Sequence, residues 1–156
     1  MRNLILVLGD QLADANPAFD GFDAARDGVL MIESAAEGRE VWSHKARIVL
    51  FLSAMRHFRD RLRGRGFGVD YWDLDRSGER SLGEVLREAV ANRQPARVIA
   101  CEPGEWRVLA ELQDACKAAG VMLELRSDTH FLLSRQEFAA WAGARRTLQM
   151  ESFYRF

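Results

Sequence analysis

The chain has 156 residues, of which 48% are hydrophobic and 29% are charged, and its formal net charge at pH 7 is −1. This size and balance are typical of one domain with a single buried core, and the near-zero net charge gives no support for binding to nucleic acid or to a membrane surface. No apolar run approaches the ~20 residues that cross a bilayer. The first residues enter a strand pattern at once, without a small-residue cleavage site, so we expect no signal peptide.

The two cysteines, Cys101 and Cys116, fall at the end of a predicted strand and in a predicted helix. We therefore expect two buried, reduced thiols in a cytoplasmic protein. Two cysteines cannot by themselves complete a structural zinc site or a cubane iron–sulfur cluster. The three histidines have no metal-ligand spacing to each other or to a cysteine, so we predict no metal site in this chain.

The first strong pattern is residues 3–12, NLILVLGDQL. A short, continuous apolar run that ends in Gly-Asp-Gln is typical of a strand buried on both faces. Residues 28–33 repeat this signature and also end in an acid. The stretch between them, residues 13–27, is rich in Asp, Gly and Pro and predicts a loop.

Residues 44–65 have apolar side chains spaced three and four apart, which predicts a helix with one buried face. Ser43 is the expected N-cap, and Gly64 and Gly66 are the expected end. The opposite face is basic. We favour a solvated helix face over a nucleic-acid contact, because acids elsewhere in the chain balance the charge.

Strand and helix patterns alternate through the remainder of the chain. Further strands are predicted over residues 69–74, 97–102 and 121–125, and further helices begin at residues 81, 105 and 134. Two of these helix starts have the Ser-x-x-Glu spacing of a capping box. The alternation predicts an α/β fold, a Rossmann-like three-layer sandwich with a five-stranded parallel sheet. We prefer the strand order 3-2-1-4-5, because the first strand is the most apolar and should be central.

Three predicted strands end in acids, namely Asp10, Glu33 and Glu102. Ligands of open parallel sheets bind beyond the carboxyl ends of the strands, so the set favours a binding site at this edge. Each acid taken singly is equally well explained as a cap or a solvent-facing residue. The sequence has no Gly-x-Gly-x-x-Gly, Walker-A run or Gly-x-Ser-x-Gly elbow, and we find no nucleophile–base pair, so we predict no catalytic residue.

Several longer strings in this chain are distinctive. They are LGDQL at residues 8–12, HK at 44–45, SAMRHF at 53–58, EPGEWRVL at 102–109 and ME-x-FYR at 150–155. In this order they closely resemble the N-terminal part of the photolyase-related proteins. This is the bacterial branch of the cryptochrome/photolyase superfamily whose catalytic half carries an iron–sulfur cluster.

The resemblance implies a division of labour between two domains. The N-terminal α/β domain would hold a dimethyl-ribityl-lumazine as antenna chromophore, without doing bond chemistry. A helical C-terminal domain would bind FAD and a four-iron cluster, dock damaged DNA and act as a deoxyribodipyrimidine photolyase-type lyase. On this basis residues 1–142 are expected to be the antenna domain, and residues 143–156 to begin the linker to a helical domain that this chain lacks.

The resemblance also implies a lumazine pocket, with Glu37 as the best candidate for a hydrogen bond to the ring and Phe51 as a wall. Together with Glu102 from the strand-end argument, the expected cofactor-binding residues are Gly9, Asp10, Gln11, Glu33, Glu37, His44, Lys45, Ile48, Phe51 and Glu102.

Two other functions stay open from the sequence. One is a stand-alone Rossmann-like module that binds a small nucleotide-like ligand, although the phosphate-binding motifs are missing. The other is an interaction domain that uses the aromatic residues Phe131, Trp141, Phe153 and Tyr154. If exposed, that surface would drive self-association.

Overall fold

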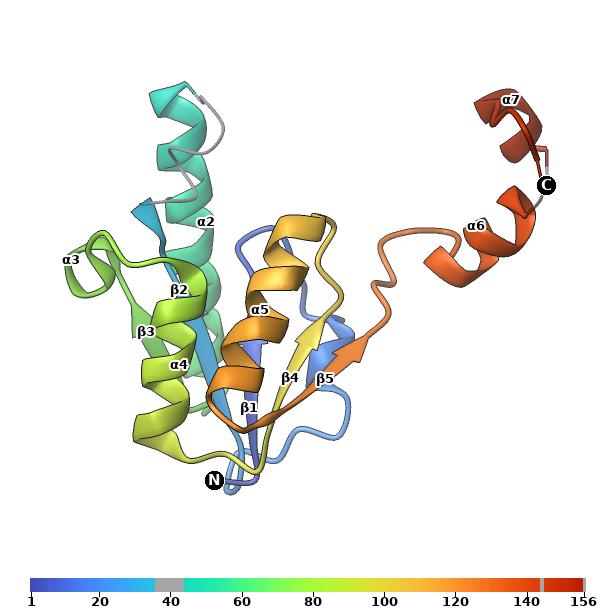
Figure 1. Cartoon of the computed structure of the whole chain (residues 1–156). Helices are drawn as coiled ribbons and strands as arrows, with labels where there is room; N and C mark the ends of the chain where they lie inside the picture. The colour runs from blue at the N-terminus through green and yellow to red at the C-terminus, as the bar shows by residue number, and fades with distance from the viewer. Residues whose placement is uncertain (36–43, 144, 156) are drawn as a thin grey trace.

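The structure, a computed structural model, describes residues 1–35, 44–143 and 145–155. Its centre is a five-stranded, all-parallel sheet in the order β3-β2-β1-β4-β5 (Figure 1). This confirms both the predicted α/β class and the predicted strand order. The strands are β1 (Asn3–Val7), β2 (Gly28–Ile32), β3 (Val69–Trp72), β4 (Arg97–Cys101) and β5 (Met122–Arg126).

Four longer helices lie where the sequence predicts them: α2 (Lys45–Gly64), α4 (Leu82–Arg93), α5 (Trp106–Ala118) and α6 (Arg135–Ala142). Both predicted capping boxes are present, at the starts of α4 and α6. Three single-turn elements, η1 (Pro17–Phe19), α3 (Leu74–Ser77) and α7 (Met150–Phe153), were not predicted. One turn is too short to show a helical period, and the third strand pattern therefore ran on into α3.

The N-cap of α2 differs from the prediction. His44 occupies this position, and its Nδ1 accepts a hydrogen bond from the Ala46 backbone N–H at 3.2 Å. The predicted cap, Ser43, lies outside the described residues. An imidazole nitrogen can replace the usual N-cap hydroxyl here, because the cap needs only one acceptor for a free backbone N–H of the first turn.

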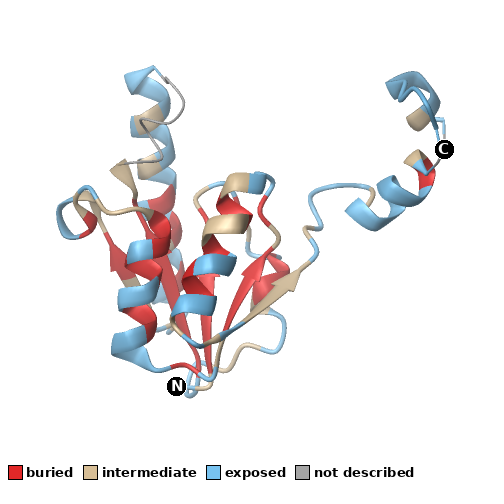
Figure 2. Ribbon diagram, in the orientation of Figure 1, coloured by how far each residue is buried: buried red, intermediate tan, exposed pale blue. Residues whose placement is uncertain are grey.

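The central strand β1 is buried on both faces, as its apolar run predicts. Leu4 and Leu6 face α4 and α5, whereas Ile5 and Val7 face α2 and the loop over residues 8–27. Figure 2 shows the resulting core as a band of buried residues between these layers. Cys101 and Cys116 are buried and unpaired, as expected, and they lie in the core clusters on opposite sides of the sheet.

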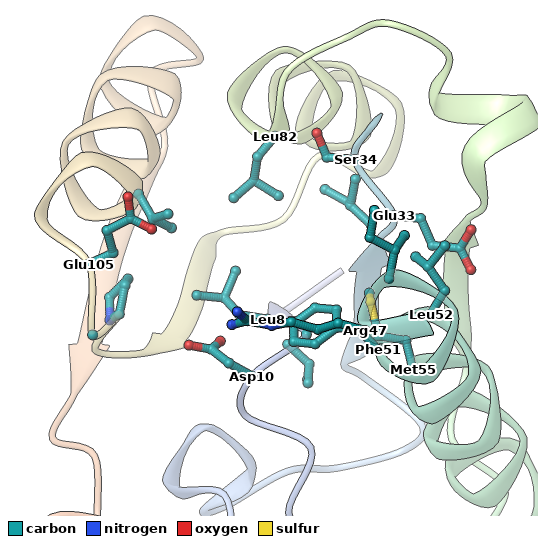
Figure 3. A pocket seen from close by; sticks show the side chains of 17 residues that line it. Leu8, Asp10, Glu33, Ser34, Arg47, Phe51, Leu52, Met55, Leu82 and Glu105 are labelled. Carbon is teal, nitrogen blue, oxygen red and sulfur yellow. The ribbon is translucent and has the colours of Figure 1, made fainter. Parts of the chain in front are cut away.

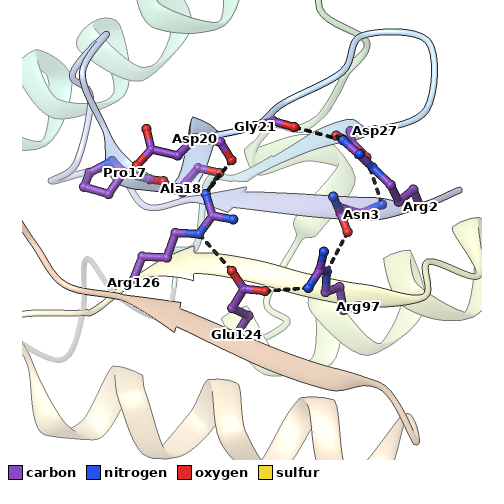
Figure 4. Close-up of polar contacts among 10 residues, drawn as sticks. All are labelled: Arg2, Asn3, Pro17, Ala18, Asp20, Gly21, Asp27, Arg97, Glu124 and Arg126. Carbon is purple, nitrogen blue, oxygen red and sulfur yellow. Dashed lines mark hydrogen bonds and ion pairs between the residues drawn. The ribbon is translucent and has the colours of Figure 1, made fainter.

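The connection from β1 to β2 has no crossover helix of ordinary length, so the loop itself covers the sheet beside α2. Arg126 on β5 fastens this loop by donating to the carbonyl oxygens of Pro17 and Asp20 at 2.8 and 2.7 Å (Figure 4). The Glu124 carboxylate accepts hydrogen bonds from Arg126 and Arg97, at 2.9 and 2.8 Å. The first of these bonds holds the Arg126 guanidinium in place. The loop is thus anchored to the edge strand by charged hydrogen bonds.

A buried carboxylate, Asp27, lies at the amino ends of the strands. It accepts from Arg2 Nε at 2.8 Å and Nη2 at 2.5 Å, and from the Asn3 backbone N–H at 3.1 Å. Its side chain has no exposed surface. The hydrogen bond from Arg2 lowers the pKa of Asp27 to about 2, although burial alone would raise it.

Replacing Asp27 with asparagine is expected to lower the free energy of unfolding by about 2 kcal/mol at pH 7, the equivalent of the pKa shift. Because the folded-state pKa lies below the unfolded one, this stabilisation is present above pH ~4 and is lost as the pH falls toward 2. Urea unfolding at pH 7 and pH 3 measures it, and the difference from the wild type should shrink by about half at pH 3. Asp60→Asn, at an exposed ion pair, should leave the stability nearly unchanged. An equal loss for Asp27→Asn at both pH values would contradict the assignment.

Helices α6 and α7 lie away from the body of the sheet (Figure 1). They pack on each other through Trp141 and Phe153, whose ring centroids are 4.9 Å apart, and Phe138 joins the same cluster. The predicted boundary at residue 142 lies between these two helices, and an irregular loop over residues 127–133 separates α6 from the sheet. None of the described helices is long and apolar enough to cross a membrane.

Candidate functional site

A cavity of about 360 Å³ opens at the carboxyl ends of β1, β2 and β4 (Figure 3). At this edge the chain leaves β1 toward β2 on one side, and β4 is the neighbour on the other side. Such a switch point is where open α/β sheets form ligand sites, because the loops after the two neighbouring strands turn in opposite directions. The described residues that line the cavity come from the strand ends, from α2 and from the starts of α4 and α5.

The cavity walls are mainly apolar. The apolar lining residues are Val7, Leu8, Ile32, Ile48, Phe51, Leu52, Met55, Leu82, Pro103 and Val108. Phe51 is 44% exposed although it faces the cavity, so a ligand there would remove its ring from water. Besides Glu33, the polar residues of the lining are Asp10, Ser34, Arg47 and Glu105.

Gly9 is the point where the end of β1 touches α2. A Cβ atom built at Gly9 would lie 2.4 Å from Cε1 of Phe51 and 2.9 Å from Sδ of Met55. Close packing against these two side chains therefore favours glycine here, whereas the backbone conformation does not demand it. This contact fixes how near the α2 wall lies to the strand end.

Glu33 borders the cavity, but its carboxylate points away from it (Figure 3). It accepts two hydrogen bonds from Arg56, at 2.7 and 2.9 Å, one from the Tyr71 hydroxyl at 2.5 Å and one from the Leu74 backbone N–H at 3.0 Å. Burial raises the pKa of Glu33, and these hydrogen bonds outweigh it, so that the pKa lies below its ordinary value. Burial also raises the pKa of Tyr71, with a further contribution from its bond to Glu33. The carboxylate is ionised and fully engaged by the protein.

The expected convergence of three acids at one site needs correction. Of the three acids, only Asp10 contributes its carboxylate to the polar lining of the cavity, because the Glu33 carboxylate is hydrogen-bonded to Arg56. Glu102 lies outside the lining, and its carboxylate pairs with Arg135 at 3.1 Å. Strand ends share an edge, but the direction of each side chain depends on which cation lies nearby.

Of four further residues expected at the site, one lines the cavity and three lie outside its lining. Ile48 lines the cavity, whereas Gln11, His44 and Lys45 do not. Gln11 is buried and donates through Nε2 to the Glu102 carbonyl at 3.0 Å, which ties the loops after β1 and β4 together. His44 caps α2, and Lys45 is exposed. Glu37 lies outside the described residues.

The sequence interpretation missed several lining residues. Pro103 and Gly104 follow β4 as Gly9 and Asp10 follow β1, so the same strand-end rule would have identified them. Arg47 lies one helical turn before Phe51 and shares its side of α2. For Leu82 on α4, no local signal exists. Among the described residues, no group of three or more His, Cys, Asp or Glu side chains is placed to hold a metal ion.

Comparison of the sequence with known proteins gives the following matches. The family model described as deoxyribodipyrimidine photo-lyase-related protein matches residues 5–156. The chain is also 44% identical over 158 residues to a (6-4) photolyase of Agrobacterium fabrum (strain C58), a match that covers 99% of this chain. The chain spans 31% of the length of that relative. Because the family model extends over nearly the whole α/β domain and both terminal helices, the chain belongs to the deoxyribodipyrimidine photo-lyase-related proteins.

Proposed function

We propose that this chain is the light-harvesting antenna domain of a photolyase-related flavoprotein, and that its cavity binds a ribityl-lumazine. The observation that carries the proposal is the position and character of the cavity, which is apolar, borders Phe51 and lies at the switch point of the sheet. Its volume of about 360 Å³ falls within the range of ~300–1,000 Å³ that is usual for small-molecule sites.

The residues present fit such a ligand. A planar heteroaromatic ring needs apolar walls, which Ile48, Phe51 and Met55 provide on α2. Its carbonyl groups and sugar-alcohol hydroxyls need a few directional partners, and Asp10, Arg47 and Glu105 are suited to this by charge and hydrogen-bonding capacity. The cavity lacks a glycine-rich phosphate loop, so side chains would hold the ligand.

When bound, the lumazine would absorb near-ultraviolet to violet light and pass the excitation energy to a flavin. We place this FAD, and a four-iron cluster, in a separate helical domain, where contact with DNA and any repair or signalling would also take place. The residues of this chain would orient the ring and exclude water from it.

Adding dimethyl-ribityl-lumazine to the purified chain tests the proposal. We expect binding of one lumazine per chain, measured by calorimetry, together with a rise in the anisotropy of its fluorescence. The same titration with a nucleotide such as ATP or NAD should show no binding. Tight nucleotide binding without lumazine binding would overturn the antenna function and favour a stand-alone nucleotide module.

Replacing Phe51 with alanine is expected to weaken lumazine binding about tenfold, because the ring of Phe51 would lose its stacking and burial against the ligand. Val49→Ala is the matched control, since Val49 is on the same helix, is 66% exposed and is not part of the cavity lining. Calorimetric titration of both variants measures the effect. Equal affinities for the two variants would remove Phe51 from the ligand contact.

A further inference from the structure

The buried carboxylate of Glu33 joins elements that are distant in the sequence. Its four hydrogen bonds come from Arg56 on α2, from Tyr71 on β3 and from the first residue of α3, Leu74. Glu33 itself is 1% exposed, whereas the Arg56 side chain is about half exposed, at 49%. The paired hydrogen bonds from Arg56 fix the plane of its guanidinium against the carboxylate, which sets direction as well as distance.

Arg56 lies directly after the α2 segment that forms the cavity wall. Met55, Leu52, Phe51 and Ile48 precede it at helical spacing and line the cavity. The first turns of α2 are largely exposed, as the upper part of this helix shows in Figure 2. The buried residues of α2, by contrast, start at Met55 and continue with Phe58 and Leu62.

The position of the α2 wall therefore depends on how Arg56 is held by Glu33. A helix rises ~1.5 Å per residue, so Ile48 lies about 12 Å along the axis from Arg56. A small rotation of the helix at Arg56 is therefore enlarged at the wall. The packing of Phe51 on Gly9 limits movement toward the strand end, but it does not prevent movement away from it.

We propose that Glu33, through Arg56 and Tyr71, is a positioning residue that sets the width of the cavity without touching the ligand. The inference rests on the proposed lumazine site for its binding readout. It assigns Glu33 a role different from the ligand contact that the sequence suggests. Arg56 and Tyr71 become part of the same functional unit, although neither lines the cavity.

Two variants test the proposal in the 156-residue chain. Glu33→Gln keeps the shape of the side chain and removes its charge, and it is expected to weaken lumazine binding about tenfold. Tyr71→Phe removes one hydroxyl and leaves the ion pair, with an expected loss of about threefold. Amide hydrogen exchange should become faster over residues 46–55 in both variants and stay unchanged at Phe58 and Leu62.

Asp27→Asn is the matched control, because Asp27 is also a buried carboxylate paired with an arginine. It lies at the amino ends of the strands, at the opposite end of the sheet from the cavity, next to Asn3 (Figure 4). Its lumazine affinity should stay within about twofold of the wild type. Equal weakening by Asp27→Asn and Glu33→Gln, or unchanged binding and exchange in both Glu33→Gln and Tyr71→Phe, would overturn the positioning role.

The outcomes separate this inference from the proposed function. A wild-type chain that binds no lumazine would refute the antenna site, and hydrogen exchange over residues 46–55 would still decide whether Glu33 positions α2. If Glu33→Gln does not fold, Tyr71→Phe still tests the proposal through lumazine affinity and through hydrogen exchange over residues 46–55. Its phenyl ring keeps the apolar surface of Tyr71 and the face against which Arg59 lies, 4.7 Å from the centroid.

Discussion

Replacing Gly9 with valine is expected to abolish the proposed binding of lumazine, with a loss in affinity of about 100-fold or more, equivalent to ~2.7 kcal/mol. Even the first atom of a side chain at this position would lie 2.4 Å from the Phe51 ring, and two methyl groups increase the overlap. Either α2 moves away from the strand end or Phe51 turns into the cavity. Overpacking of this kind also costs about 1–3 kcal/mol of stability.

Gly68→Val is the control for this prediction. Gly68 precedes β3 and is not part of the cavity lining, and a Cβ atom there would have no heavy atom within 4 Å. Its affinity for lumazine should remain close to that of the wild type, as measured by calorimetric titration. Normal binding by Gly9→Val would show that the contact between Gly9 and Phe51 does not shape the site.

Replacing Leu6 with alanine is expected to lower the free energy of unfolding by about 3 kcal/mol or more. Leu6 lies in the central strand and has no exposed surface, and it belongs to the core cluster that β1 forms with α4 and α5. Neighbouring strands and helices fix the space around it, so the missing atoms leave a void that the fold closes only in part. For a domain with a total stability of ~5–15 kcal/mol, this is a large fraction.

Urea unfolding followed by circular dichroism measures this effect as a shift of the midpoint at constant slope. Leu132→Ala is the matched control, because Leu132 is fully exposed and should change stability by less than ~0.5 kcal/mol. A similar midpoint for both variants would mean that the β1 core is less tightly packed than the structure shows.

Local sequence patterns predict most of the fold because they report local physics. The apolar run of β1 indicates burial on both faces and favours a central position in the sheet, which is why we preferred the order 3-2-1-4-5. The capping boxes at Ser81 and Ser134 mark two helix starts because the partners are only three residues apart. Single-turn elements such as α3 escape this kind of prediction, because a periodic pattern needs more than one period.

The candidate site is only partly predictable for the same reason. Gly9 and Asp10 could be placed at the carboxyl edge of the sheet from the strand pattern alone, and both line the cavity. Gln11 follows directly in the chain, yet it turns into the protein and bonds to a carbonyl 91 residues away. Nothing in the local sequence distinguishes these two outcomes.

The sequence by itself determined the α/β class, the main helices and the sheet edge at which the cavity opens, and it favoured the strand order that the structure shows. Only the tertiary structure decided what the acids at that edge do. Glu33 is joined to Arg56 and Tyr71, which follow it by 23 and 38 residues, while Asp10 lines the cavity. A carboxylate at a strand end has the same local pattern in both cases. Its role depends on which cations and hydroxyls the packing of distant elements brings within hydrogen-bond distance, and that information is not local.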